Sequence, residues 1–148
     1  MTELVRLADV AMAAMRVRLG TAHGLPAVGK WAMSGTDRII AIGPDEWLVM
    51  AEDADAAALQ VRLASRDGVV VDVSGNRAIY RAAGPGARWF LSAGCGFDLD
   101  TLSTGDAIST LLARAQVLVV TETSENFLVM PRRSFAGYLE EWAATIDG

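Results

Sequence analysis

Cysteine and histidine, the residue types best suited to nucleophilic or metal chemistry, occur once each in this sequence. Cys95 lies between two glycines in the segment WFLSAGCGFDLD (89–100), and His23 lies in the loop TAHGLPAVG (21–29). A catalytic thiol needs a base nearby and a third group that orients the base. Nothing in the sequence brings His23 to Cys95, and the C-terminal end of a helix does not activate a thiol. We therefore interpret Cys95 as a small buried residue at a tight turn.

The acidic residues predict neither a metal site nor an acid–base pair. One cysteine and one histidine cannot form a structural zinc site. Asp98 and Asp100 would hold a hard cation only with further oxygen ligands. We expect them to be solvated loop acids, or Asp98 to cap the short segment after it. Two adjacent acidic pairs would point in different directions and form no dyad; they are Asp45 with Glu46 and Glu140 with Glu141.

Glycine-rich, aromatic and basic residues indicate no nucleotide site. The segment GPGARWF (84–90) lacks the third glycine of a dinucleotide-binding turn, and no Walker A sequence is present. Gly84 and Gly86 therefore indicate a turn that enters a helix. The tryptophans could stack on a ligand, but tryptophan more often anchors a core or an interface; they are Trp31, Trp47, Trp89 and Trp142. Five arginines could bind carboxylates, phosphates or an acidic partner segment; they are Arg77, Arg81, Arg88, Arg132 and Arg133. We predict no catalytic residue, no cofactor-binding residue and no metal ligand, and infer that the chain binds or supports a partner.

Composition indicates a globular protein without a nucleic-acid or membrane surface. The 148 residues are 52% hydrophobic, and the formal net charge is −5. An acidic balance predicts no strong phosphate-binding surface, so we expect no nucleic-acid partner. The longest apolar runs, around 69–73 and 117–120, have the length of strands, so we expect no membrane span. The mean hydropathy of +0.30 is high enough to suggest cover by partner subunits.

The start of the chain and its cysteine usage favour the cytoplasm. Glu3 and Asp9 interrupt the segment MTELVRLADVAMAAMRVRLG, so it is not typical of a signal peptide. A single cysteine cannot form an internal disulfide. We therefore expect a cytoplasmic protein.

Apolar patterning predicts helices over 4–19, 54–65 and 85–93, and a last helix capped by Ser134. Proline would start the third helix and Gly94 would end it. Period-two or continuous apolar runs predict strands; these are KWAMS (30–34), RIIAI (38–42), WLVMA (47–51), a buried VVVDVS (69–74), AIYRA (78–82), AISTLLA (107–113), QVLVVTE (116–122) and FLVMP (127–131).

A weak internal repeat relates the two halves of the chain at an offset of 80 residues. The segment 39–64 aligns with 119–144, and both contain the triple Leu-Val-Met before a helix. With 4–19 matched to 85–93, each half is predicted to contain a helix, a strand, a hairpin and a helix. Hairpin-plus-helix units on antiparallel sheets define an α+β fold. We expect one domain over 1–148, with pseudo-repeat halves of about 1–74 and 75–148.

Several motifs in a fixed order carry a family resemblance. They are GPDEWLVM (43–50), the segment from VVVDVS to GCGFDLD (69–100), GDAISTLLARAQVLVV (105–120) and FLVMPRRSFAGYLEEW (127–142). Over about residues 38–144 the chain resembles the gamma subunit of heterotetrameric sarcosine oxidase. That family is itself similar to the folate-binding aminomethyltransferase of the glycine cleavage system, whose pattern D-x-S followed by G-P-x-A is matched here by Asp72, Ser74, Gly84, Pro85 and Ala87.

The resemblance includes one departure. In the aminomethyltransferases a strand after a glycine-rich turn carries acidic residues, one of them important for folate chemistry. The comparable segment here, RAQVLVV (114–120), lacks the glycines and is apolar over Val117–Val120. The resemblance thus implies a shortened relative that has lost the catalytic acid.

The resemblance implies a structural subunit of an amine oxidase with several flavins. Such a complex oxidises sarcosine to glycine and transfers the one-carbon unit to tetrahydrofolate. FAD, FMN, NAD and tetrahydrofolate are expected in the larger alpha and beta subunits, with a delta subunit as a further partner candidate. Three alternatives stay open: the equivalent subunit of a dimethylglycine or N-methylglutamate oxidoreductase, a stand-alone folate-binding protein, and a protein-binding adaptor unrelated to amine oxidation.

Overall fold

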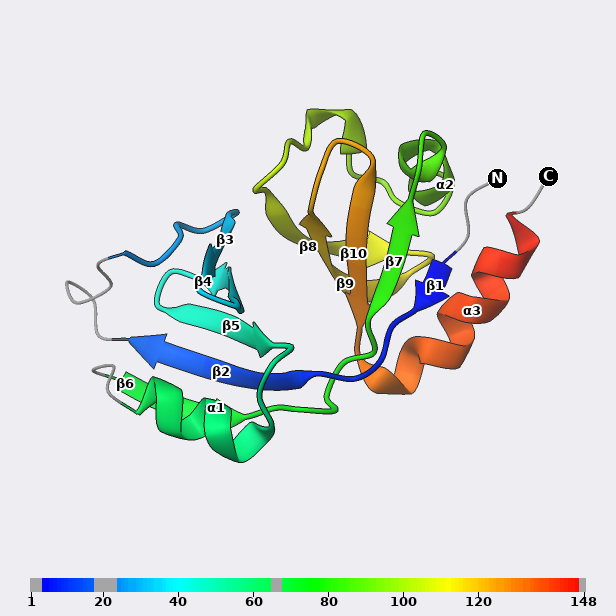
Figure 1. Ribbon diagram of the computed structural model, residues 1–148. Helices are drawn as coiled ribbons and strands as arrows, with labels where there is room; N and C mark the ends of the chain where they lie inside the picture. The colour runs from blue at the N-terminus through cyan, green and yellow to red at the C-terminus, as the bar shows by residue number, and fades with distance from the viewer. Residues whose placement is uncertain (1–3, 18–23, 65–67, 147–148) are drawn as a thin grey trace. The chain divides into compact units, whose positions relative to one another are not determined.

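The computed structural model describes residues 4–17, 24–64 and 68–146 and divides the chain into two compact units (Figure 1). One unit is Asp9–Gly75, and the other combines Met1–Ala8 with Asn76–Gly148. Within the described residues, each unit contains a five-stranded antiparallel sheet, with one α-helix packed on it in the unit Asp9–Gly75 and two in the other unit. The expected α+β class with antiparallel sheets is confirmed. No helix among the described residues is long and apolar enough to cross a membrane.

The unit Asp9–Gly75 has the strand order β3-β4-β5-β2-β6. Its elements are β2 (Ala11–Val17), β3 (Trp31–Ser34), β4 (Asp37–Gly43), β5 (Glu46–Ala51), α1 (Ala56–Leu63) and β6 (Gly68–Asp72). The side chain of Asp55 caps α1 by accepting a hydrogen bond of 2.8 Å from the Ala58 amide. Leu59 and Leu63 then bury one face of α1 in the core of this unit, as the sequence predicts.

The other unit has the strand order β1-β7-β10-β9-β8. Its elements are β1 (Leu4–Arg6), β7 (Tyr80–Ala83), α2 (Ala87–Ser92), the 3₁₀ turn η1 (Leu99–Thr101), β8 (Ala107–Leu112), β9 (Ala115–Thr121), β10 (Asn126–Pro131), the 3₁₀ turn η2 (Arg133–Phe135) and α3 (Ala136–Thr145). Phe90 and Leu91 of α2 and Leu139 of α3 enter the core of this unit.

The two sheets share one arrangement, which explains the sequence repeat. A hairpin followed by a helix occurs as β4, β5 and α1 and again as β9, β10 and α3. Successive side chains of a strand point to opposite faces, so Val49 and Val129 of the repeated triple enter the two cores. The flanking leucines and methionines lie on the other face of each sheet and are also buried; they are Leu48, Met50, Leu128 and Met130.

The predicted helix over 4–19 is wrong. Within its described part the chain forms β1 and β2, and β2 pairs with β5 on one side and β6 on the other. The segment AMAAMRV is apolar at almost every position, and such a run fits a buried strand as well as a helix. Pairing along both edges decides in favour of the strand. The predicted match between 4–19 and 85–93 is wrong for the same reason, because β2 takes the place of β7 in the other sheet.

The segment VVVDVS forms a strand, but its predicted burial is wrong. β6 lies at the edge of its sheet, and Val69 and Val71 are 63% and 53% exposed. The remaining predicted strands are confirmed, with β4 and β5 joined at the turn GPDE.

Two helix boundaries differ from the prediction. Gly84 has a left-handed φ of +102°, so α2 begins only at Ala87, two residues after Pro85. At the start of the last helix the 3₁₀ turn η2 intervenes, so Phe135, and not Ser134, precedes α3.

Gly94 follows the end of α2, but it is not the left-handed C-cap that the sequence predicted. The C-cap residue is Ala93, and Gly94 does not adopt a left-handed φ. A Cβ atom at Gly94 would lie 2.5 Å from the Trp142 ring of α3. This tryptophan also makes an edge-to-face contact with Phe90, at 5.6 Å between ring centroids. Glycine is therefore required here by close packing between the end of α2 and α3.

We predict that Gly94→Ala lowers the free energy of unfolding by about 1–3 kcal/mol, because the added methyl group displaces the Trp142 ring. Gly96→Ala is the matched control, since no neighbouring atom lies within 4 Å of its added Cβ. Urea unfolding followed by tryptophan fluorescence measures both variants. Equal stability of the two variants would contradict this role of Gly94.

Candidate functional site

Cys95 occupies a structural position between α2 and β8. Its backbone forms an isolated antiparallel bridge with Leu112, and its half-buried side chain packs on the core of this unit. The thiol lies 3.8 Å from the Thr110 hydroxyl. Cys95 is thus half-buried, whereas the sequence analysis expected it to be buried. His23 lies outside the described residues, so its distance from Cys95 is not defined.

The acidic candidates form local contacts. Within 4–17, 24–64 and 68–146, no group of three or more His, Cys, Asp or Glu residues could hold a metal ion. Asp98 caps η1, as one of the two interpretations expected, by accepting a hydrogen bond of 3.1 Å from the Asp100 amide. Glu46 pairs with Arg16 at 3.2 Å on the surface. Glu140 and Glu141 are exposed on α3.

Arg88 of α2 binds three backbone carbonyl groups. Its Nε donates to Ser124 O at 2.9 Å, and its two Nη atoms donate to Leu99 O and, at 2.8 Å, to Leu102 O. Its guanidinium also lies 5.1 Å from the centroid of the Phe127 ring. A charged donor bound to carbonyl groups forms stronger hydrogen bonds than a neutral donor. Arg88 therefore joins α2 to both ends of η1 and to the β9–β10 turn.

Two further arginines form hydrogen bonds or ion pairs within the sheet of the same unit. Arg81 forms a two-pronged ion pair with Glu122, at 2.8 and 3.0 Å. Arg77 donates to Met130 O at 2.9 Å, and its backbone bridges that of Arg132. Burial of the guanidinium, and next the charge of Arg132, lower the pKa of Arg77 from its ordinary value. Arg77 therefore ties the segment before β7 to β10, and Arg81 ties β7 to the turn after β9.

The four tryptophans divide into packed and exposed positions. Trp47 is buried and donates to Pro26 O at 2.8 Å, and Trp142 packs on the core next to Gly94. The Trp31 ring lies 4.6 Å from the Arg38 guanidinium. Trp89 differs from the others, because 67% of its surface is exposed. Of the four, Trp89 is the most exposed.

Four of the five residues that match the aminomethyltransferase pattern have structural contacts, and the fifth, Pro85, is exposed. Asp72 accepts a hydrogen bond of 3.0 Å from the Ser74 amide, which lowers the pKa of the Asp72 carboxyl group. The Ser74 hydroxyl accepts from the Met12 amide at 2.9 Å and donates to Met12 O at 3.3 Å, next to the β2–β6 pairing. Gly84 donates its amide to Glu125 O at 3.0 Å, and Ala87 is fully buried.

The segment RAQVLVV corresponds to β9 and to the turn that precedes it. Val117 and Val119 enter the core of their unit, and Leu118 and Val120 on the other face are also buried. β9 pairs with β8 and β10. The apolar side chains therefore fill a paired inner strand on both faces, where an acidic group would be buried.

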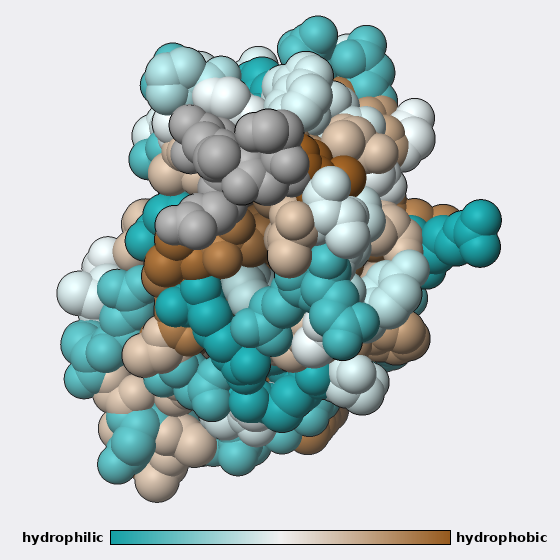
Figure 2. All heavy atoms as spheres, turned by 90° about the vertical axis from the view of Figure 1, so that its right-hand side faces the viewer, coloured by the Kyte–Doolittle hydropathy of each residue, from teal (hydrophilic) through white to brown (hydrophobic). Residues whose placement is uncertain are grey.

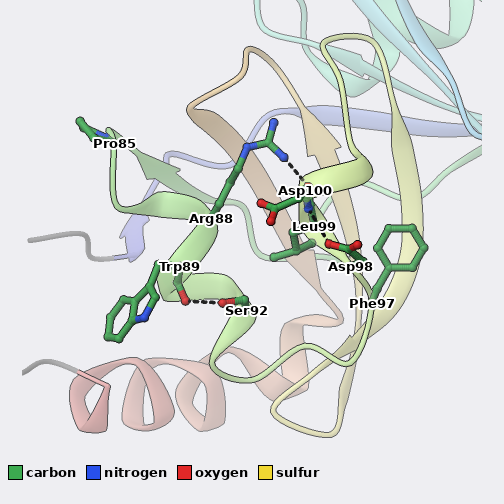
Figure 3. Close-up of a pocket in the computed structure, with 8 residues that line it drawn as sticks. All are labelled: Pro85, Arg88, Trp89, Ser92, Phe97, Asp98, Leu99 and Asp100. Carbon is green, nitrogen blue, oxygen red and sulfur yellow. Dashed lines mark hydrogen bonds between the residues drawn. The ribbon is translucent and has the colours of Figure 1, made fainter.

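An open groove lies between α2 and η1, and the sequence did not predict it. It has a volume of about 480 Å³ and is lined by Pro85, Arg88, Trp89, Ser92, Phe97, Asp98, Leu99 and Asp100. Figure 3 shows Trp89 and Phe97 at opposite ends of this α2–η1 groove, with the two aspartates between them. The sequence identified Trp89 as a possible anchor, but its exposure depends on the packing of α2.

Apolar side chains interrupt the polar surface of the molecule (Figure 2). Large apolar side chains that are more than 40% exposed occur in both units; they include Val28, Met33, Val61, Val69, Val71, Trp89, Phe97, Leu111, Phe135 and Tyr138. Single exposed apolar residues are normal in soluble proteins. The α2–η1 groove is distinguished because its aromatic residues lie around one hollow with two carboxylates.

Comparison with solved structures first defines the fold. Aminomethyltransferase T of the glycine cleavage system from Bartonella henselae aligns with 95% of this chain and 44% of its own, at a TM-score of 0.68. The sequences are 13% identical, so this likeness shows the fold alone. The chain has the α+β fold of the aminomethyltransferases.

Sequence comparison then defines the family. The model of the sarcosine oxidase gamma subunit family matches residues 6–147, and the chain belongs to this family. The sarcosine oxidase subunit gamma of Corynebacterium sp. (strain U-96) is 37% identical over 129 residues, which cover 82% of this chain and 62% of the relative. The corresponding subunit of an Arthrobacter species is 35% identical over 137 residues, which cover 88% and 66%.

One solved relative is a heterotetramer. The heterotetrameric sarcosine oxidase from Corynebacterium sp. U-96 in complex with pyrrole 2-carboxylate contains a chain that is 30% identical, with a TM-score of 0.84. The match covers 97% of this chain and 82% of that one. This chain spans about two thirds of the length of the curated relatives that it matches.

We predict that Arg88→Met lowers the free energy of unfolding by about 2–3 kcal/mol, because three carbonyl groups lose a charged donor. Arg132→Met is the matched control. Arg132 is exposed, and its side chain forms no hydrogen bond within the described residues. We therefore expect this control to change the free energy of unfolding by less than about 0.5 kcal/mol. Thermal unfolding measures both variants, and an unchanged Arg88→Met would show that the three carbonyl contacts contribute little.

Proposed function

We propose that this chain is a small structural subunit, without an active site of its own, of a heterotetrameric flavin-dependent sarcosine oxidase. Membership of the gamma subunit family supports the assignment to such a complex. The observation that carries the structural role is that four of the five residues matching the aminomethyltransferase pattern, namely Asp72, Ser74, Gly84 and Ala87, bind or pack against this chain's own backbone and core. Such residues stabilise a fold and leave the chemistry to partner chains.

In this proposal the complex oxidises sarcosine to glycine and transfers the one-carbon unit to tetrahydrofolate. Larger alpha and beta subunits, with a delta subunit as a further candidate, would bind FAD, FMN, NAD and tetrahydrofolate. Support comes from the apolar β9, which provides no acid where the related transferases are expected to have one. The complex would act in the cytoplasm. The substrate would bind in another chain, so a dimethylglycine or N-methylglutamate oxidoreductase is the alternative within the same role.

Co-expression with the larger subunits from the same organism tests the proposal. We expect a yellow complex that contains this chain in a fixed ratio and oxidises sarcosine. A complex that oxidises another N-methylated amino acid instead would keep the structural role and change the substrate. Failure of this chain to associate with any flavin-containing chain, together with micromolar binding of tetrahydrofolate by the isolated chain in calorimetry, would favour a stand-alone folate-binding protein.

We predict that Cys95→Ser in the assembled complex changes kcat and KM by less than about twofold, because the thiol lies at a structural position. Serine can keep the contact with Thr110, whose hydroxyl lies 3.8 Å from the sulfur. Steady-state kinetics with sarcosine on purified complex measures the effect. A loss of more than about tenfold with intact assembly would assign Cys95 a role in the reaction.

A further inference from the structure

We propose that the α2–η1 groove binds a segment of a larger subunit that presents an arginine next to an apolar side chain. This inference rests on the proposed function and names the surface that would carry it. The groove combines exposed aromatic rings with carboxylates. Trp89 is 67% exposed and Phe97 is 41% exposed, and Asp98 and Asp100 are exposed between them.

The charge of the groove determines the chemistry of its occupant. Its charged residues are two aspartates and one arginine, which gives a net negative charge of one. The Arg88 guanidinium is directed at three carbonyl groups of its own unit and forms no ion pair with either aspartate. The Asp98 carboxylate accepts one backbone hydrogen bond, so it keeps further acceptor sites for a cation.

The aromatic residues of the groove favour arginine over lysine as the cation of the partner segment. A planar guanidinium can lie flat on an indole ring and bind a carboxylate with two parallel hydrogen bonds, whereas an ammonium group interacts with both as a compact point charge. Trp89 lies one residue after Arg88 and at one end of the groove, as Figure 3 shows. An apolar side chain beside the arginine would cover the remaining ring surface. Tryptophan at the centre of an interface often contributes a large part of the binding free energy.

The groove is already ordered before a partner binds. Arg88 joins α2 to Leu99 and Leu102 at the two ends of η1, and the Asp98 backbone carbonyl accepts from the Thr101 hydroxyl at 2.7 Å. The two walls are therefore held together by hydrogen bonds within this chain. A preformed surface loses little conformational entropy on binding, so an exposed tryptophan here can be used for association.

Association of the full-length chain with its purified larger subunits tests the inference. We expect Trp89→Ala and Asp100→Lys each to raise the Kd of assembly at least tenfold. The matched controls are Val61→Ala, at a 77% exposed apolar residue of α1, and Glu141→Lys, at an exposed acid of α3. Both controls should bind within about twofold of the unmodified chain. Asp100→Glu should retain most of the affinity, and Asp100→Lys should weaken the dependence of binding on salt.

The outcomes separate this inference from the proposed function. If the unmodified chain does not bind the larger subunits, the proposed function and the inference both fail. If it binds, and Trp89→Ala and Asp100→Lys bind equally well with unchanged unfolding midpoints, only the inference fails. If Trp89→Ala instead abolishes self-association of the isolated chain and leaves assembly unchanged, the groove binds a second copy and the inference is overturned.

Discussion

The structure depends on burying both faces of the inner strands of its two sheets. In β5 and β10 the repeated triple Leu-Val-Met places valine in the core of the unit and buries leucine and methionine on the opposite face. Each such side chain contributes about 1.5–3 kcal/mol when it leaves water. This requirement explains why the inner strands are continuous apolar runs. It also explains why β9 carries valines where an acid would have to be buried.

Two residues that match the aminomethyltransferase pattern lie at the ends of this framework. The Ser74 hydroxyl binds both backbone groups of Met12 beside β2, and Gly84 supplies the left-handed turn before α2. Arg88 then holds α2 against η1 and the β9–β10 turn through three carbonyl groups. The result is a rigid surface around Trp89. The chain thus has the fold of the aminomethyltransferases, and its residues of chemical interest donate or accept hydrogen bonds within the chain or pack on its core.

Much of the fold could be predicted from the sequence, since most strands and the hairpin-plus-helix repeat follow from local patterning. The strand at 11–17 could not be predicted, because an apolar run rich in alanine and methionine also fits a helix. It becomes a strand through pairing with β5 and β6. The exposure of Val69 and Val71 likewise depends on the edge position of β6. For the candidate site, the sequence indicated the capping role of Asp98 and the aromatic anchors. The groove could not be predicted, because it depends on the position of η1. A hydrogen bond from Arg88 to Leu102 O, 14 residues further along the chain, holds that position.

In the proposed function, this chain contributes a folded surface to a complex and leaves the reaction to other chains. Reconstitution of the larger subunits with and without this chain tests the claim most directly, with sarcosine turnover expressed per bound flavin. We expect turnover per flavin to be preserved without this chain in the fraction that stays assembled, while the thermal stability of the complex falls. Fully assembled, flavin-loaded larger subunits that turn over only when this chain is added would contradict it.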